Sequence, residues 1–340
     1  MNSLSKALVA ITAMLGLSTG SALAATTSFE AMWVIGDSFS DTGNLFKSSG
    51  NTFPSNALGY ANGRLSNGTL WVEHVAAGLG LPALTPGFNQ SFTAGNNLAV
   101  AGARTDTTNS LGAFADGSGM RSQVNGFSTF YRPALSNTQV ANSLFVVAAA
   151  GNDVTLWTDT SDLGARDAVI QQSMTNLDGL IRDLHTAGAQ SFLVPNFSGV
   201  IVPDDWSPQF AVDRMTNFAP TYNMELASLM TNLRTDLGVT IYEVDFHALF
   251  QELLTDTTDS ISNVTAPCLD LSAVGAFQGV CGNPDAFLMY DALHPTAAAH
   301  QLMGATALSA IPLPATLPLL SAALGGLFWR LRASPQRKAL

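Results

Sequence analysis

Short apolar runs alternate with longer amphipathic segments along most of the chain. Such runs, rich in aliphatic, β-branched and aromatic residues, are typical of strands covered on both faces. Four of them predict strands: 32–35, 143–150, 192–194 and 240–244. Between the runs, residues 169–184 and 218–233 place apolar side chains at helical spacing, which predicts helices that pack on a sheet. This alternation favours βαβ units, and therefore an α/β fold with a parallel sheet between helical layers.

Polar turns follow the first two predicted strands. Gly36-Asp37-Ser38 ends the first, and Gly151-Asn152-Asp153 ends the second. In open α/β sheets, ligands bind in the crevice outside the carboxyl ends of the strands, so Ser38 is a candidate nucleophile. The alternative is an ordinary turn whose Ser and Asp side chains cap a helix. This segment alone does not decide between the two.

The stretches between these runs give three further expectations. Residues 63–74 form a glycine-punctuated loop that leads into a helix ending within 78–82. Residues 97–100 predict a short strand that ends just before Gly102. Residues 105–124 are polar and have no clear period, which predicts an excursion over the surface.

Both ends of the chain differ from its middle. Lys6, the apolar run 7–17 and the small residues at 22–24 have the plan of a secretory signal peptide, so we expect a mature chain beginning near Ala25. A buried N-terminal helix is the alternative. The tail combines prolines, an apolar stretch and a basic cluster, and its apolar part is slightly short for a membrane span. Its alternative is a last core helix of the domain, which the prolines disfavour.

The length and the charge of the chain favour a protein with one large core and argue against a nucleic-acid-binding protein. The 340 residues carry a formal net charge of −11 and are 47% hydrophobic, which suits one large core. Five of the 14 basic residues lie in the two terminal segments, so the body is more acidic than the whole chain. Such a body repels polyanions, and we expect no nucleic-acid partner.

The two cysteines, Cys268 and Cys281, lie close together in a loop that contains proline and glycine. If the chain is exported, we expect them to form a disulfide, with free thiols as the alternative. Neither belongs to a CxxC motif or a Cys/His cluster, so the sequence predicts no metal site.

A base and the carboxylate that orients it occur together near the end of the domain. Asp291 and His294 are three residues apart in a turn closed by Pro295, so one carboxylate can accept the Nδ1 proton of the ring. The other four histidines fall in predicted helices or apolar settings. Gly102 and Asn152, at the ends of other predicted strands, are candidate donors to an oxyanion.

The ordered blocks resemble the GDSL family of the SGNH hydrolases, which are serine esterases and lipases. Gly36 to Asn44, Asn97 to Arg104, Gly151 to Asp153 and Asp291 to Pro295 match its four blocks in order, with Phe39 where the family name has leucine. The resemblance implies a three-layer α/β/α sandwich with a flavodoxin-like parallel sheet. It also implies a catalytic triad of Ser38, His294 and Asp291, an oxyanion hole of the Ser38 and Gly102 N–H groups and the Asn152 side chain, and no cofactor.

The tail is similar to the VPLPA variety of the PEP-CTERM sorting signals of Gram-negative bacteria, with Ile311 in place of Val. This resemblance implies export to the periplasm, the cell surface or the medium, transient membrane association, and a sorting enzyme that processes the tail. The expected organisation is a signal peptide (1–24), a hydrolase domain (25–310) and a C-terminal sorting signal or membrane segment (311–340).

The expected function is that of an exported serine esterase or lipase, which hydrolyses small-molecule or lipid esters through an acyl-enzyme on Ser38. Two alternatives remain open. The same acyl-enzyme can transfer its acyl group to an alcohol, and an inactive hydrolase scaffold can serve as a surface or matrix binding protein.

Overall fold

The computed structural model describes residues 28–88, 94–149, 151–159, 162–199, 217–255, 261–271 and 277–312. The chain divides into a body, Phe29–Ile311, and a second unit made of the two ends, Met1–Ser28 and Pro312–Leu340. The predicted signal peptide and almost all of the predicted sorting signal lie outside the described residues. No helix in the described ranges combines the length and apolar character that crossing a membrane requires.

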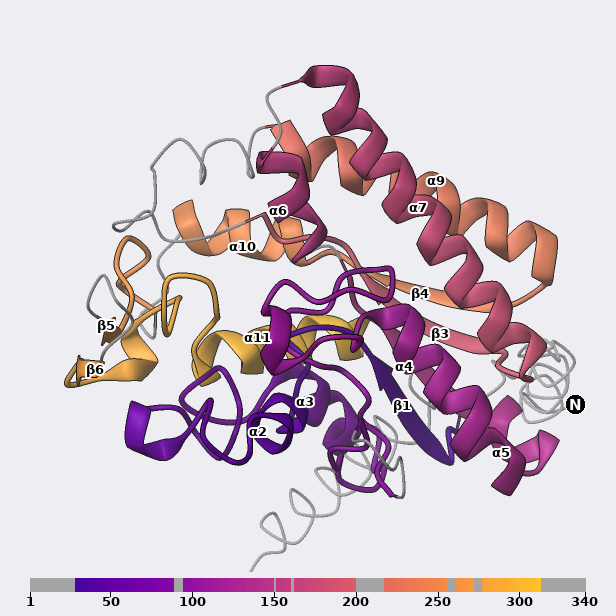
Figure 1. The fold of residues 1–340 in the computed structure, drawn as a ribbon, viewed down its shortest axis with the longest axis horizontal. Coiled ribbons are helices and arrows are strands. Elements are labelled where there is room, and N and C mark those ends of the chain that lie inside the picture. Colours follow the sequence, from indigo (N-terminus) through magenta and orange to yellow (C-terminus); the bar gives the residue numbers. More distant parts are fainter. Residues whose placement is uncertain are drawn as a thin grey trace, which may run out of the picture. The chain divides into compact units, whose positions relative to one another are not determined.

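A parallel sheet of four strands lies at the centre of the body (Figure 1). Its strands follow one another in chain order: β1 (Ala31–Ile35), β2 (Ser143–Val147), β3 (Ser191–Pro195) and β4 (Thr240–Val244). Each falls within or around one of the four apolar runs, so all four predicted strands are confirmed. Three of them, β1 to β3, are buried almost throughout, as a sheet covered on both faces requires.

The segment 97–100 lies along the free edge of β1 but is not a regular strand. Leu98 N–H donates to the Val34 carbonyl at 2.8 Å and Val100 N–H to the Gly36 carbonyl at 3.2 Å, while only Val34 and Asn97 form a bridge pair. Because β1 ends at Ile35, the hydrogen-bond ladder between β1 and the segment 97–100 stops after these few bonds. With this segment counted as the second strand, the order is the 2-1-3-4-5 of flavodoxin-like sheets.

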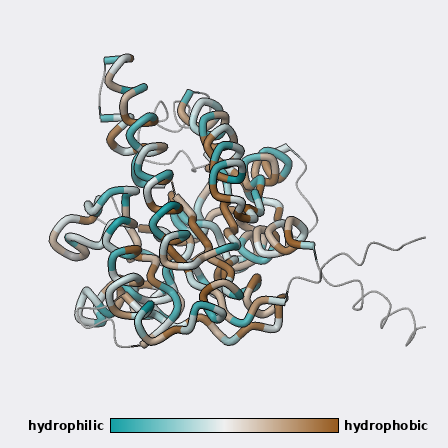
Figure 2. The backbone as a smooth tube through the Cα atoms, turned by 90° about the vertical axis from the view of Figure 1, so that its right-hand side faces the viewer, coloured by the Kyte–Doolittle hydropathy of each residue, from teal (hydrophilic) through white to brown (hydrophobic). Residues whose placement is uncertain are grey.

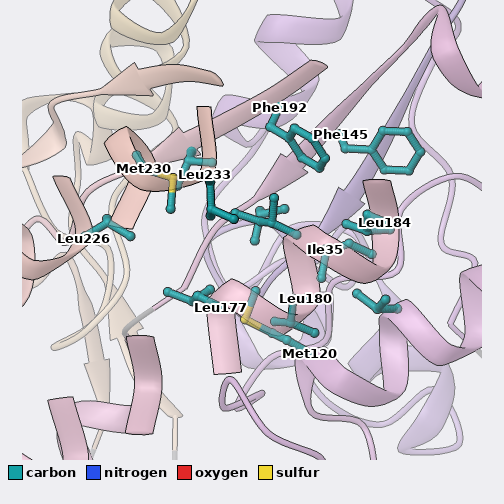
Figure 3. Close-up of a cluster of buried hydrophobic side chains, with 14 of the residues drawn as sticks. Ile35, Met120, Phe145, Leu177, Leu180, Leu184, Phe192, Leu226, Met230 and Leu233 are labelled. Carbon is teal, nitrogen blue, oxygen red and sulfur yellow. The ribbon is translucent and has the colours of Figure 1, made fainter. Parts of the chain in front are cut away.

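One face of the sheet packs against α4 (Met120–Gly126), α7 (Leu163–Thr186) and α9 (Ala219–Leu237). Strand side chains such as Ile35, Phe145 and Phe192 meet Leu177, Leu180, Met230 and other helical residues there (Figure 3). In a strand, successive side chains point to opposite faces, so alternate residues supply this core.

The intervening strand residues, among them Val34, Leu144 and Val146, pack against helices on the opposite face. These helices are α3 (Trp71–Gly78), α10 (Phe246–Thr255) and α11 (Ala297–Ser309). Hydropathy follows the same layering, since the inner strands are hydrophobic and the outer helices mixed (Figure 2). The expected three-layer α/β/α sandwich is confirmed.

Shorter elements connect these layers. They are α2 (Asn44–Ser48), α5 (Asn137–Ala141), α6 (Asp153–Thr158) and the antiparallel pair β5 (Leu269–Leu271) and β6 (Phe277–Val280). Single turns of 3₁₀-helix occur at Asn56–Leu58, Gly112–Phe114, Arg132–Ala134 and Pro284–Ala286, and a π-helical turn at Phe127–Tyr131.

The prediction of a surface excursion over 105–124 was partly wrong. Helix α4 begins within this stretch, and Thr105, Ser118 and Gln123 are buried. Their side chains make hydrogen bonds inside the body, for example from Gln123 to Gly36. Buried polar residues in this stretch form internal hydrogen bonds. Hydropathy alone predicts that such residues are exposed to solvent.

Candidate active site

A cavity of about 80 Å³ opens beyond the carboxyl ends of β1, β2 and β3. Its polar lining includes Ser38, Asn152 and His294, which come from three of the predicted sequence blocks. Most of the remaining wall is apolar and includes Phe39, Trp71, Phe197, Phe246 and Leu293. The parallel sheet therefore brings segments that are far apart in sequence to one site, as expected for strands that end on the same edge.

The turn that carries Ser38 is fixed through the backbone just before it. Gly36 N–H donates to Gln123 Oε1 at 2.9 Å, and Gln123 Nε2 donates back to the Gly36 carbonyl at 2.9 Å. The Asp37 side chain then accepts from Phe39 N–H at 3.2 Å. Ser38, half-buried, lies between these anchors on the cavity wall.

Asp41 joins this turn to the neighbouring segment. It is 2% exposed, and its carboxylate accepts backbone N–H groups from Gly43, Asn44 and Leu45 at the start of α2 and from Ala101 beyond the edge segment. Burial raises the pKa of Asp41, and these four hydrogen bonds oppose the rise. Because the Asp41 carboxylate accepts hydrogen bonds from these four backbone N–H groups, we assign it a structural role.

Asn152 directly precedes α6, and its side chain joins the second polar turn to the residues after Gly102. Its Nδ2 donates to the Ala103 carbonyl at 3.1 Å and makes a longer contact of 3.5 Å with Asp37 Oδ2. The next residue, Asp153, accepts from the Thr105 hydroxyl at 2.7 Å, and burial raises its pKa. One N–H of the Asn152 amide is thus only weakly engaged.

Gly102 lies at the adjoining bend with φ +82° and is buried. A Cβ there would lie 2.3 Å from Asn109 Oδ1, so both the backbone conformation and the packing require glycine. Among the described residues that line the cavity, Gly102 does not appear, whereas Ser38, Asn152 and His294 do.

The last block forms a compact hydrogen-bonded turn. His294 Nδ1 lies 2.8 Å from each oxygen of Asp291, and Asp291 Oδ1 also accepts the N–H groups of Leu293 and His294. Burial alone would raise the pKa of Asp291, but the nearby His294 and these hydrogen bonds hold it below its ordinary value. The carboxylate is therefore ionised at neutral pH and fixes the ring with Nδ1 towards it.

A family model described as GDSL-like Lipase/Acylhydrolase matches residues 32–306. The chain belongs to this family. It is accordingly a serine hydrolase that acts on carboxylic ester bonds.

Curated relatives of this esterase include plant and bacterial proteins. Acetylajmalan esterase 2 of Rauvolfia serpentina is 28% identical over 322 residues, which cover 80% of this chain and 88% of the relative. The thermolabile hemolysin of Vibrio parahaemolyticus is 27% identical over 285 residues, which cover 78% of this chain and 60% of the hemolysin. Among solved structures, a catalytic mutant of the acetylxylan esterase Axe2 from Geobacillus stearothermophilus aligns with a TM-score of 0.41 at 12% identity, over 85% of this chain and 96% of that one.

Two residues of the esterase that sequence reasoning left without a role also lie at the site. Tyr60, 4% exposed, donates its hydroxyl to Asp291 Oδ2 at 2.8 Å. His300 is fully buried, and its Nδ1 accepts from Trp71 N–H at 3.3 Å. Burial lowers the pKa of His300 to about 3, so this ring is neutral. No local sequence pattern predicts the hydrogen bond of Tyr60, because its partner is 231 positions away in the sequence.

The expected disulfide between Cys268 and Cys281 is present. It closes the β5–β6 hairpin, whose Cys268 N–H and Leu269 N–H donate to the carbonyls of Met289 and Tyr290 at 3.2 and 2.6 Å. The cross-linked segment is thus hydrogen-bonded to the two residues that directly precede Asp291. Within the described residues, no group of three or more His, Cys, Asp or Glu side chains is placed to hold a metal ion.

Proposed function

We propose that the esterase cleaves its substrate through an acyl-enzyme on Ser38, with His294 as general base and Asp291 as the residue that orients it. The observation that supports this proposal most strongly is the Asp291–His294 hydrogen bond beside a cavity that Ser38 and His294 both line. With Nδ1 held by the carboxylate, Nε2 is the ring nitrogen free to take a proton.

In the first half-reaction, Ser38 Oγ attacks the ester carbonyl while His294 Nε2 accepts the hydroxyl proton. The carbonyl oxygen becomes an oxyanion, and we assign its stabilisation to the N–H groups of Ser38 and Gly102 and to Asn152 Nδ2. The weakly engaged N–H of Asn152 supports this assignment, because a donor with a long contact of 3.5 Å can turn to a better acceptor. His294 then returns the proton to the leaving alcohol.

The second half-reaction repeats these steps with water. His294 removes a proton from the water, the hydroxide attacks the acyl-enzyme, and the collapse of the intermediate releases the acid and restores Ser38. Acyl transfer to an alcohol follows the same path with the alcohol in place of water. The aromatic lining suits an ester with an apolar acyl or alcohol part.

The test is the turnover of a chromogenic short-chain ester by the full chain and by Ser38→Ala. We expect Ser38→Ala to lose at least about 10³-fold in kcat, because the bond-forming atom is removed. Ser40→Ala is the matched control: Ser40 lies in the same motif, is fully buried, and its hydroxyl has no hydrogen-bond partner within the described structure. If Ser38→Ala keeps the turnover of Ser40→Ala, the acyl-enzyme proposal is wrong.

Two further measurements separate this function from its alternatives. An ester product formed from added alcohol, in preference to free acid, would make the protein an acyltransferase. Absence of turnover on a panel of esters of graded chain length, together with retained ligand binding, would favour a binding protein on a hydrolase scaffold.

We also propose that the protein is exported, with the N-terminal 24 residues as its signal peptide. The disulfide supports this proposal, because disulfides persist in oxidising compartments. We assign the tail, residues 311–340, to sorting and processing at a bacterial membrane, with the periplasm, surface or medium of a Gram-negative cell as destination. Mass measurement of the protein recovered outside the cytoplasm tests both cleavages, and a recovered intact chain would refute them.

A further inference from the structure

The segment that follows α2 reaches across to the loop that carries the proposed base. The Tyr60 hydroxyl donates to Asp291 Oδ2 at 2.8 Å, and the Ser66 hydroxyl donates to the Pro295 carbonyl at 2.9 Å. All of these groups are buried or nearly so. The Asp291–His294 pair is thus held from outside its own loop as well as from within it.

The two oxygens of Asp291 are held by different parts of the chain. Oδ1 accepts the N–H groups of Leu293 and His294, at 2.9 and 2.8 Å, which belong to the same turn. Oδ2 accepts the hydroxyl of Tyr60 from a distant segment. His294 Nδ1 lies 2.8 Å from both oxygens. Bonds on both oxygens oppose rotation of the carboxylate about its Cβ–Cγ bond, and Tyr60 supplies the anchor on the Oδ2 side.

The surrounding charges leave the Tyr60 hydroxyl in its donating form. Burial and the neighbouring Asp291 carboxylate both raise the pKa of Tyr60, so the phenol stays protonated. The other titratable groups that face the pair are Tyr290, whose hydroxyl donates to the Gly59 carbonyl, and His300 on α11. Neither of these contributes a hydrogen bond to Asp291 among the bonds of the described residues.

We propose that Tyr60 is a positioning residue of the reaction. Its hydroxyl fixes the orientation of the Asp291 carboxylate relative to His294, and its hydrogen bond partly neutralises the negative charge of the carboxylate. This inference rests on the proposed roles of Ser38, His294 and Asp291. The Tyr60 hydroxyl is engaged with Asp291, and Tyr60 is not among the described residues that line the cavity. Its effect is transmitted through Asp291 to the ring.

Tyr60→Phe removes the hydroxyl and keeps the ring, which makes edge contacts with Phe53 and Tyr290 at 5.7 and 5.8 Å between centroids. We expect kcat to fall by about tenfold, the scale of one lost hydrogen bond to a charged group, with KM unchanged. The acid limb of the kcat/KM profile moves to higher pH. The carboxylate, with one donor fewer, holds a proton more tightly and also stabilises protonated His294 more strongly.

Tyr290→Phe is the matched control. It makes the same chemical change next to Asp291, but the lost hydroxyl donates to Gly59. We expect a loss of stability without movement of the acid limb. A purely structural role for Tyr60 predicts the same for Tyr60→Phe, so an unmoved acid limb in a folded Tyr60→Phe protein overturns the inference.

A measurement that needs no turnover separates this inference from the proposed function. In the Ser38→Ala background, the low-field proton signal of the Asp291–His294 hydrogen bond, assigned by its loss in His294→Ala, should shift on Tyr60→Phe and not on Tyr290→Phe. An unchanged signal overturns the role of Tyr60 and leaves the acyl-enzyme intact. Full turnover by Ser38→Ala overturns the acyl-enzyme itself, and the role of Tyr60 falls with it.

Discussion

The turn that carries the proposed nucleophile, residues 36–40 (the nucleophile turn), continues directly from β1. The loop that carries the proposed base, residues 290–296 (the base loop), lies between the 3₁₀ turn Pro284–Ala286 and helix α11. In the nucleophile turn, a buried glutamine holds the N–H and carbonyl groups of Gly36. In the base loop, the Asp291 side chain accepts a backbone N–H of its own turn. Two hydroxyl groups of a distant segment donate to the same loop, from Tyr60 to Asp291 and from Ser66 to the Pro295 carbonyl.

The nucleophile turn and the base loop are therefore held in position in two different ways. The nucleophile turn is fixed by bonds that also close the end of a core strand, so its geometry and the stability of the fold depend on the same atoms. The base loop is fixed by the buried side chains of Tyr60 and Ser66, which lie outside the central sheet, so its geometry can be lost while the sheet stays intact. Loss of Gln123, which anchors the nucleophile turn, should therefore cost mainly stability, and loss of the Asp291 charge in the base loop mainly activity.

The largest expected effect comes from the base loop. Asp291→Asn keeps an acceptor for the backbone N–H groups but removes the charge that fixes the tautomer of His294 and stabilises its protonated form. We expect kcat to fall by about 10⁴-fold, with a much smaller change in the free energy of unfolding. Asp285→Asn, at an exposed aspartate six residues earlier, is the control and should leave kcat unchanged. A large drop in stability without a matching drop in kcat would contradict the comparison.

The next effect tests the nucleophile turn. Gln123→Leu leaves both the N–H and the carbonyl of Gly36 buried without their partner, and each lost partner costs about 2 kcal/mol. We expect the free energy of unfolding in urea to fall by about 4 kcal/mol, a large part of the stability of a typical domain.

Gln171→Leu, at an exposed position of α7, provides the control for this change of side chain. Turnover per folded Gln123→Leu molecule should fall far less than in Asp291→Asn. If Gln123→Leu unfolds as the wild-type protein does and yet loses its activity, the nucleophile turn is not anchored as described.

The same contrast explains what could be predicted from the sequence. Asp291 and His294 are three residues apart, so their contact is visible in the chain itself, and Ser38 follows directly from a readable strand. Gln123 and Tyr60 have partners 87 and 231 positions away. Which buried polar side chain meets which backbone group depends on the packing of whole elements, and hydropathy assigned Gln123 to a surface excursion. Local spacing thus predicted the contact between Asp291 and His294, whereas the contacts of Gln123 and Tyr60 required the fold.

The smallest expected effect concerns the contact between α3 and α11, the helix that follows the base loop. His300, on the helix after the base loop, accepts the Trp71 N–H at the start of α3 and is fully buried. Burial, helped by the neighbouring His294 and His74, lowers the pKa of His300 to about 3, against an ordinary value of 6.5. Between these two pH values the unfolded chain binds a proton that the folded protein excludes, so the stability from this group is present above pH 6.5 and is lost on acidification.

His300→Asn keeps an oxygen near the position of Nδ1 for the Trp71 N–H and removes the titration. Between pH 7 and pH 5, the wild-type protein should lose about 2 kcal/mol more of its free energy of unfolding than His300→Asn, measured in urea at both values. His185→Asn, at the end of α7, controls for the replacement of a histidine. Equal losses in the wild type and His300→Asn would mean that the ring already takes up its proton in the folded state.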